Sequence, residues 1–416
     1  MKTILIKLSQ CLMIALFLTC LNQRAYSQYS QDGLRGLNAT VFAAAVDTNG
    51  NLYVGGEFTK AGGASAQYDA MWSAHIDTNI YPNNGDAIVH NIAVWYPGAP
   101  GWSSLIHPSW QGGEGVVGTV KAIAVGPDRN VYVGGTFTSA GGGIVPANDI
   151  ACWNPTSLTW TNMGDYGVYG GTLDPGSVNG ICVSGGNVYA VGDFLSAFNW
   201  GSGGNISATN IAAWNIASYT WHNVGPAPPV GIAYTIMTHD GTNFYVGGHD
   251  GIVRGVLNNG TNTWHFMDAN LVGSVNAIAI TPGGRLFIGG LFSGVLPQRG
   301  NYCSLAEWNG SLNAFVIVTN FLYGGTVSSV NALAVYNDNL IVGGRFDFPD
   351  NPGNPTYWMA NIARFNLTSN QWFTMGPTTY DSQIGGAGLG GPGPGENAYG
   401  VLALAVVADT NAMVTV

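Results

Sequence analysis

Short apolar runs that end in two glycines recur along the chain. They occur in "NLYVGGEFTKAGG" from Asn51, "NVYVGGTFTSAGG" from Asn130, "NFYVGGHDG" from Asn243, "RLFIGGLFSG" from Arg285 and "NLIVGGRFDF" from Asn339. An apolar run rich in small residues precedes most of them, as in "VKAIAV" and "VNALAV", and turns such as "DTNGN" and "GPDRN" join the two. Because Asn, Asp and Gly tolerate the positive φ of tight hairpins, each pair of runs predicts a β-hairpin.

A second pair of apolar segments completes each unit. The first segment reads "NIAVW", "DIACW", "NIAAW", "SLAEW" or "NIARF", and the second carries a large side chain seven positions after the first one. The spaced pairs are Trp95 and Trp102, Trp153 and Trp160, Trp214 and Trp221, Leu257 and Trp264, Trp308 and Phe315, and Phe365 and Trp372. This constant spacing predicts a second rigid hairpin whose two large residues pack on the same side.

Six such units predict an all-β fold. A four-stranded antiparallel unit cannot bury both of its faces alone, so neighbouring units must stack, and radial stacking gives a β-propeller. We expect six or seven blades over residues 28–416, with the Ala-rich strand innermost. The glycine pairs are expected to allow close backbone approach and positive φ. A last strand pair begins at Val401; it either closes the ring against the first unit or belongs to a longer protein, and a closed ring with an imperfect seam is favoured.

The pattern "YVGGxFTxAGG…NIAxWN…W" resembles the kelch repeat, in the variant found in secreted bacterial repeat proteins. The resemblance covers roughly residues 40–416, and it implies a propeller. Kelch-type propellers include binding modules and oxidases, so the resemblance does not imply one function. Two units depart from it: the fourth lacks the phenylalanine and the NIA signature, and the third reads "AVGDF" with one glycine lost. The copper ligands and modified tyrosine of the oxidases find no match.

The first residues predict export. Lys2 and Lys7 precede an apolar core, and Ala25-Tyr26-Ser27 fits a small-x-small cleavage site, so residues 1–27 are interpreted as a signal peptide. We expect a secreted or cell-surface protein that is not inserted in the membrane after cleavage. Cys152, Cys182 and Cys303 remain, and an odd number makes a disulfide framework unfavourable. The repeat alignment predicts that Cys152 and Cys182 are small buried hydrophobes.

The net charge of the chain limits the classes of partner that it can bind. The 416-residue chain has a formal net charge of -10, only 8% charged residues and no basic cluster, which argues against nucleic acid. The content of 46% hydrophobic residues argues against disorder. We therefore expect a folded monomer whose partner is a glycan or another protein.

Loop length predicts which face binds. All length variation falls between the second and third strands of a unit, or between one unit and the next, and these connections emerge on one face of an antiparallel blade. Variable loops on a rigid scaffold are where binding sites usually lie. The candidate ligand-binding residues are Trp72, His75, Asp77, His90, Trp110, Tyr166, Tyr169, Trp200, His249, Asp250, Tyr302 and Tyr357. Their aromatic rings can stack on sugars or contact a protein, and they can alternatively pack within their own loops.

Metal and catalytic motifs are sparse. Asp69, His75, Asp77 and His90 could hold a metal, but their spacing matches no known pattern. Asp347 and Asp350 in "DFPDNPGNP" are weak calcium candidates, with a Pro-rich loop as the alternative; no other cofactor is expected. No GxSxG or HExxH motif is present.

His249-Asp250, with Arg254 nearby, is the best enzymatic candidate, and a shortened loop capped by a turn is the competing interpretation. The sequence thus favours a non-catalytic binding module. A polysaccharide lyase or hydrolase acting on the same face is the second interpretation, and a structural or adhesive part of a larger surface protein is the third.

Overall fold

The computed structural model describes most of the chain between residues 37 and 415. The described residues are 37, 39–61, 87–96, 102–106, 114–164, 167–169, 176–199, 204–238, 240–256, 263–297, 300–319, 322–323, 326–327, 329–349, 358–373, 387–388, 401–406 and 413–415. Within them every regular element is a strand except the single 3-10 turn η2 (Gly141–Gly143). The expected signal peptide at residues 1–27 lies outside the described residues.

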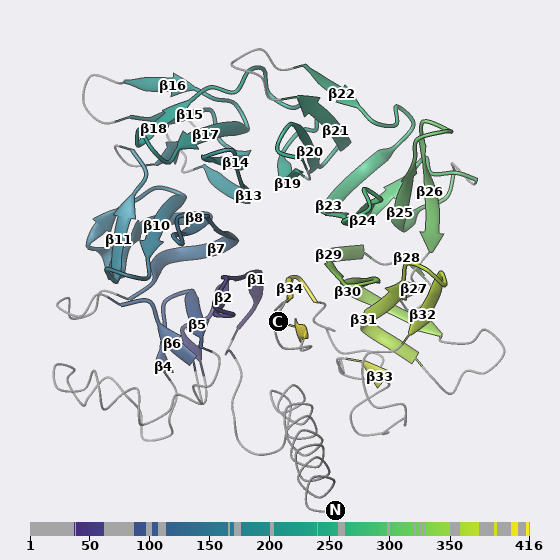
Figure 1. Cartoon of the computed structure of the whole chain (residues 1–416), viewed down its shortest axis with the longest axis horizontal. Helices are drawn as coiled ribbons and strands as arrows, with labels where there is room; N and C mark the ends of the chain where they lie inside the picture. The colour runs from purple at the N-terminus through teal and green to yellow at the C-terminus, as the bar shows by residue number, and fades with distance from the viewer. Residues whose placement is uncertain are drawn as a thin grey trace, which may run out of the picture.

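Six four-stranded antiparallel blades follow one another around a central axis (Figure 1). The innermost strands are β1 (Val41–Val46), β7 (Val116–Val125), β13 (Ser177–Ser184), β19 (Ala233–Thr238), β23 (Val272–Ile280) and β29 (Ser329–Tyr336). The second strands are β2 (Leu52–Gly56), β8 (Val131–Ala140), β14 (Asn187–Asp193), β20 (Asn243–Gly248), β24 (Leu286–Ser293) and β30 (Asn339–Pro349). We number the blades 1 to 6 in this order.

The outer half of each blade is the second predicted hairpin. The third strands are β5 (Ile92–Trp95), β10 (Ile150–Asn154), β17 (Ile211–Asn215), β21 (Gly251–Val256), β25 (Cys303–Asn309) and β31 (Trp358–Asn366). The outermost strands are β6 (Trp102–Ser104), β11 (Thr159–Asn162), β18 (Thr220–His222), β22 (Trp264–Phe266), β26 (Ala314–Thr319) and β32 (Gln371–Phe373). The all-β propeller expected from the repeats is therefore confirmed, with six four-stranded blades.

The glycine pairs are sites of close contact between and within blades. A Cβ atom on the first glycine, Gly55 or Gly134, would overlap the valine of the next blade's inner strand, Val120 or Val178. A Cβ on the second glycine, such as Gly135, would overlap the backbone carbonyl of Thr119. A register shift in each inner strand, such as that between Val120 and Ala122, lies opposite the pair and allows this approach.

The glycine pairs do not use positive φ, so that part of the sequence interpretation was wrong. Gly55 and Gly134 lie within paired strands and are not among the described glycines that have positive φ. Positive φ occurs instead at the asparagine of the NIA signature, just before β5 and β17 and within β31. Asn91, Asn210 and Asn361 have φ of 64°, 62° and 63°, which explains the recurring asparagine of the NIA signature.

Five of the six spaced aromatic pairs are directly opposite each other in the outer hairpin. They are Trp95 and Trp102, Trp153 and Trp160, Trp214 and Trp221, Trp308 and Phe315, and Phe365 and Trp372. The ring centroids of each pair lie within 5.6 Å. The sixth assignment was wrong: Trp264 pairs with Gly255, not Leu257, because the turn of blade 4 is longer. Its indole ring occupies the space above Gly255, where the other blades carry a large side chain.

A final strand pair lies between blades 6 and 1. β34 (Leu404–Val406) pairs with β35 (Met413–Thr415), and β34 contacts both β29 and β1 (Figure 1). Ala405 is buried with Leu52 and Val54 of blade 1, whereas Val401 is buried with Ile341 of blade 6. The ring thus closes through the strand pair that the sequence suggested for the seam.

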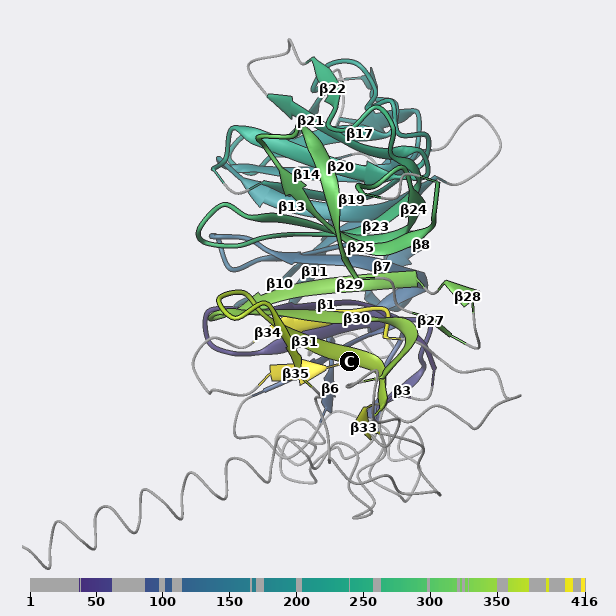
Figure 2. The same cartoon turned by 90° about the vertical axis from the view of Figure 1, so that its right-hand side faces the viewer.

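Several short strands lie within the long connections. They are β3 (Lys60–Ala61), β4 (Ala87–Ile88), β9 (Val145–Pro146), β12 (Val168–Tyr169), β15 (Ser196–Phe198), β16 (Asn205–Ser207), β27 (Leu322–Tyr323), β28 (Thr326–Val327) and β33 (Ala387–Gly388). β12, β15 and β16 form a separate three-stranded sheet beside blade 3. Figure 2 views the ring from its edge and shows β27 and β28 projecting on one side.

Candidate binding surface on the loop-bearing face

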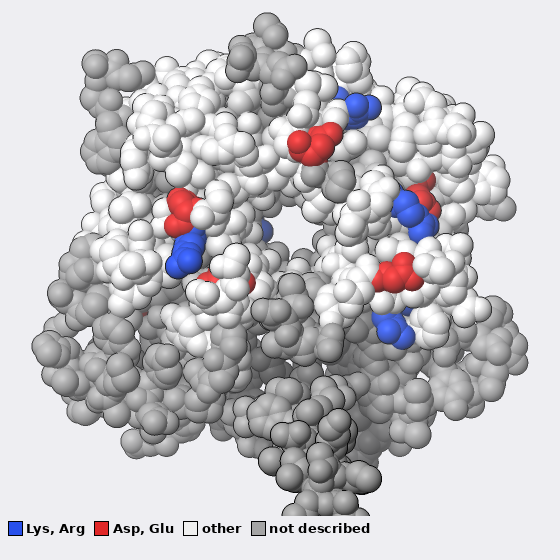
Figure 3. Space-filling model, viewed as in Figure 1, with Lys and Arg blue, Asp and Glu red and all other residues white. Residues whose placement is uncertain are grey.

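The two faces of the ring differ in the length of their connections. On one face, which we call the turn-bearing face, the first and second strands are joined by tight turns. Asp47 Oδ1 accepts hydrogen bonds from the backbone nitrogens of Asn49 (2.8 Å) and Asn51 (2.9 Å), so "DTNGN" is a hairpin turn as predicted. The opposite, loop-bearing face carries the long connections. A space-filling view shows an opening at the ring centre and charged side chains in separate small groups (Figure 3).

Blade 4 has an unusually short connection on the loop-bearing face. Only His249 and Asp250 separate β20 from β21. The backbone nitrogen of His249 donates to Ile232 O (3.1 Å), and that of Asp250 donates to Val230 O (3.0 Å). These bonds hold the turn against the entry to β19, so the sequence alternative of a shortened, turn-capped loop describes this segment correctly.

His249 and Asp250 form an exposed pair. His249 Nδ1 lies 2.7 Å from Asp250 Oδ1, and the two side chains are 65% and 60% exposed. Arg254 does not join them. Its Nε and Nη2 bond to Asn243 Oδ1, at the other end of β20. The structure therefore separates the proposed His-Asp-Arg group into a pair on the loop-bearing face and an arginine near the turn-bearing face.

Three exposed aliphatic side chains lie on the same face as the His249–Asp250 pair, in blade 4 and the two blades beside it. Leu195, Ile232 and Val272 are 51%, 40% and 64% exposed. Asn210 Nδ2 bonds to Gly231 O beside Asp250, and Leu195 O accepts from Ala208 N two residues before Asn210. Val272 follows Leu271, whose carbonyl is 3.4 Å from a Cβ built on Gly251. We call Leu195, Ile232, His249, Asp250 and Val272 the blade 4 surface.

His90 belongs to a different contact. Its Nδ1 lies 3.4 Å from Glu114 Oε2, and the interaction with this carboxylate raises the pKa of His90. The backbone carbonyl of His90 also accepts from Val116 N (3.0 Å). His90 thus joins the connections of blades 1 and 2, across the ring from blade 4 in Figure 1, and it is not part of the blade 4 surface.

Tyr302 lies on the loop-bearing face of blade 5, where it is 58% exposed. The other predicted contact residues, Trp72, His75, Asp77, Trp110, Tyr166, Trp200 and Tyr357, lie outside the described residues, as do Asp69 and Asp350. Tyr169 and Asp347 lie in β12 and β30, but their side chains are not described.

The described residues show no cluster suited to a metal or a nucleophile. In this part of the chain, no three His, Cys, Asp or Glu side chains gather closely enough to hold a metal ion. Burial raises the pKa of the Cys152 and Cys303 thiols to about 12, and that of Cys182 to about 11, so these thiols stay protonated at neutral pH. The prediction of a small buried hydrophobe is confirmed for Cys152, whereas Cys182 is half-buried. Cys303, for which the repeats made no prediction, is also buried.

Sequence reasoning identified His249 and Asp250 but missed their aliphatic neighbours. Leu195, Ile232 and Val272 belong to apolar runs that look like buried strand ends, and they lie on the same face as the short blade 4 connection. A signal was present in the two-residue spacing between Gly248 and Gly251.

In the described segments, no helix is long and apolar enough to cross a membrane.

Comparisons with known proteins add little beyond the fold. No protein-family model and no curated protein matches the chain. The extracellular domain of a candidate one-component system from B. thetaiotaomicron is 11% identical over 91% of this chain and 38% of that chain, with a TM-score of 0.49. A mitotic checkpoint complex structure is 13% identical over 91% of this chain and 87% of that chain, with a TM-score of 0.48. The designed protein Ika8 is 12% identical over 83% and 78%, with a TM-score of 0.41. The chain spans about two fifths of the length of the bacterial domain.

Proposed function

We propose that this chain is an exported, non-catalytic binding module that takes its partner on the loop-bearing face. The observation that carries the proposal is the blade 4 surface, where three exposed aliphatic side chains of adjacent blades share one face with an exposed His–Asp pair. Exposed apolar side chains grouped with polar ones are typical of interaction sites. Export rests on the sequence of residues 1–27 alone.

A protein partner suits the blade 4 surface better than a sugar. Leu195, Ile232 and Val272 bury apolar area against a protein, but they lack the flat rings on which sugars stack. A glycan remains the partner expected at Trp72, Trp110 and Trp200, whose connections belong to the same face. Tyr302, exposed on the neighbouring blade, could serve either kind of partner.

The test is capture of a surface protein by the purified chain. Leu195→Asp and Val272→Asp should abolish capture, because each places a charge in the contact. Leu312→Asp is the matched control, since Leu312 is 57% exposed in a turn of the opposite face. Capture that survives both blade 4 substitutions, the deletion of residues 64–90, and alanine at Trp110 and Trp200 would show that this face is not the binding face.

The enzymatic alternative depends on the His249–Asp250 pair. A carboxylate 2.7 Å from an imidazole nitrogen can orient a general base. Both side chains are more than half exposed, so water screens the interaction and competes for the imidazole. Polysaccharide cleavage by the purified chain, lost in His249→Ala, would favour the enzyme over the binding module.

A further inference from the structure

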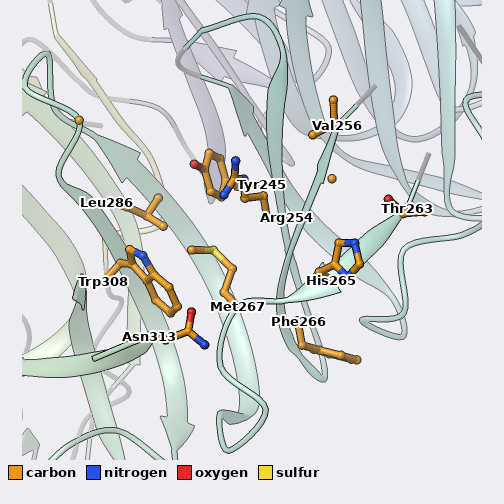
Figure 4. A pocket seen from close by; sticks show the side chains of 12 residues that line it. Tyr245, Arg254, Val256, Thr263, His265, Phe266, Met267, Leu286, Trp308 and Asn313 are labelled. Carbon is orange, nitrogen blue, oxygen red and sulfur yellow. The ribbon is translucent and has the colours of Figure 1, made fainter. Parts of the chain in front are cut away.

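A pocket of about 470 Å³ lies between blades 4 and 5. Its volume is within the range of small-molecule sites, roughly 300–1,000 Å³. Tyr245, Arg254 and His265 of blade 4 line one side, and Leu286, Trp308 and Asn313 of blade 5 line the other (Figure 4). Gly284 and Asn313 belong to turns of the turn-bearing face, so the pocket opens away from the blade 4 surface and stands independently of the proposed function.

Blade 4 contributes an arginine, a tyrosine and a histidine from three adjacent strands to the pocket. In register, Arg254 lies opposite Tyr245 on one side and His265 on the other. The positions equivalent to Arg254, which pair with the tyrosines of blades 1, 2 and 3, are the buried residues Val94, Cys152 and Ala213. A cation therefore occupies a third-strand position that is apolar in those three blades. Blades 5 and 6 carry Glu307 and Arg364 there. The positions equivalent to His265 in blades 1, 2 and 3 are polar: Ser103, Thr161 and His222.

The guanidinium of Arg254 is held by a neutral acceptor. Its Nε and Nη2 donate to Asn243 Oδ1 at 2.9 and 2.6 Å. Asn243 Nδ2 in turn donates to Asp240, so the nearest carboxylate with a recorded bond contacts the amide rather than the arginine. Arg254 forms no ion pair within the described part of the chain. The Nη1 end of the fork therefore remains available for a carboxylate, which it matches in geometry and charge.

Aromatic rings accompany this cation. Trp308 is half-buried across the pocket, Tyr245 is half-buried beside Arg254, and the neighbouring Phe266 is 47% exposed. Trp308 also packs against Phe315 with ring centroids 5.1 Å apart, which fixes the orientation of its indole. An oriented indole offers an apolar face for the C–H groups of a sugar ring.

From this combination of groups, we propose that the pocket binds a sugar that carries a carboxylate, a hexuronic acid unit. The Arg254 guanidinium pairs with the carboxylate, Trp308 contacts the ring, and Asn313 and His265 are positioned for the hydroxyl groups. The ligand is a short unit rather than a long polyanion, because the chain carries a net charge of -10 and Asp240 lies beside Asn243.

Calorimetric titration with a glucuronate or galacturonate disaccharide tests the proposal, with the neutral disaccharide of the same linkage and acetate as companion probes. We expect saturable binding of the acidic disaccharide, weakened at least tenfold by Arg254→Gln. Arg129→Gln removes the same charge from an exposed turn of blade 2 and should leave binding unchanged. Equal binding of the neutral disaccharide would overturn the role of the carboxylate, and acetate binding as tightly would overturn the role of the sugar ring.

Trp308→Phe separates stacking from charge. Phenylalanine occupies the equivalent position in blade 6 as Phe365, so the substitution should preserve the fold. It should weaken the acidic disaccharide several-fold and leave the thermal unfolding midpoint nearly unchanged. No binding by the wild-type protein, or identical binding by wild type and Arg254→Gln, would overturn the proposal.

Discussion

Val191 and Ala233 pack together in one buried cluster between blades 3 and 4, reversing the sizes found at the other blade interfaces. Elsewhere a glycine of the second strand faces a valine of the next inner strand, as Gly134 faces Val178 and Gly289 faces Val330. In blade 3 the lost glycine is Val191, and the following blade carries alanine instead of valine. The larger and smaller side chains have exchanged places, and the interface stays closed.

This exchange predicts a double-substitution result. Gly134→Val should destabilise the protein by about 1–3 kcal/mol, because its side chain would overlap Val178. Val178→Ala alone leaves a small cavity, whereas the double variant reproduces the pairing of Val191 and Ala233. Denaturant unfolding should therefore show that the double variant is more stable than Gly134→Val. Simple addition of the two single effects would show that these residues are not in contact.

The buried carboxyl of Asp149 should make the free energy of unfolding depend on pH. It occupies the position of Asn91, Asn210 and Asn361, is fully buried, and its Oδ2 has no hydrogen-bond partner. Burial raises the pKa of Asp149 from 3.8 to about 7, against the opposing effects of the Phe137 and Gly176 backbone N–H groups and Lys121. The folded state therefore binds the proton more tightly than the unfolded state, and stability falls as pH rises from about 4 to about 7.

Asp149→Asn removes this dependence. The amide should match the acid near pH 4 and exceed it increasingly up to pH 7, by a free energy of unfolding on the order of 4 kcal/mol if the full pKa difference is expressed. Urea unfolding of both proteins between pH 4 and pH 8 measures the difference. Parallel stability curves for the two proteins would contradict the buried, protonated carboxyl.

Replacing tryptophans of the outermost strands should lower the stability of the protein by amounts that depend on how deeply their hydrogen bonds are buried. Trp221 Nε1 donates to Met163 O (2.7 Å) in a buried site, and Trp264 Nε1 donates to Pro226 O (2.8 Å) in an exposed one. Trp221→Phe should cost about 1–3 kcal/mol because a buried carbonyl loses its donor, whereas water can replace the donor at Trp264. Chemical unfolding of the two phenylalanine variants gives the comparison. A larger loss at Trp264 would contradict the role assigned to burial.

Alanines of the inner strands should not tolerate charge. Ala122, Ala277 and Ala332 are each 7% exposed and lie opposite the first glycine of the pair. Aspartate at any of them should prevent soluble folding, because the carboxylate is buried without a partner. Ala217→Asp, in an exposed turn, is the matched control. Normal melting of all three inner-strand variants would contradict the packing described.

The sequence was sufficient for the repeat, the strand order and the outer hairpin, because alternation, turn residues and aromatic spacing act locally. It was insufficient for contacts that depend on the neighbouring blade. The glycine pairs were correctly interpreted as sites of close approach, but their valine partners lie about 28–65 positions away in the chain. In blade 4 the seven-residue spacing predicted the wrong pair. Gly255 stands opposite Trp264, where the other blades have a large side chain, and the turn between the two strands is longer.

The candidate sites were harder to predict than the fold. His249 and Asp250 stood out because they directly follow a glycine pair, but Arg254 lies four residues along a strand from Asp250 and points to a different partner. The pocket residues Tyr245, His265 and Trp308 come from three strands of two blades. Only the register between these strands brings them together.

The central claim is that six blades and the terminal strand pair form one closed ring. Hydrogen exchange of the full chain, compared with a chain ending at Gly400, tests it most directly. Removing β34 and β35 uncovers Leu52, Val54 and Ile341, so the account predicts a lower unfolding midpoint and faster amide exchange in β1 and β29 than in β13. Unchanged protection of β1 and β29 in the shortened chain would contradict ring closure by this strand pair.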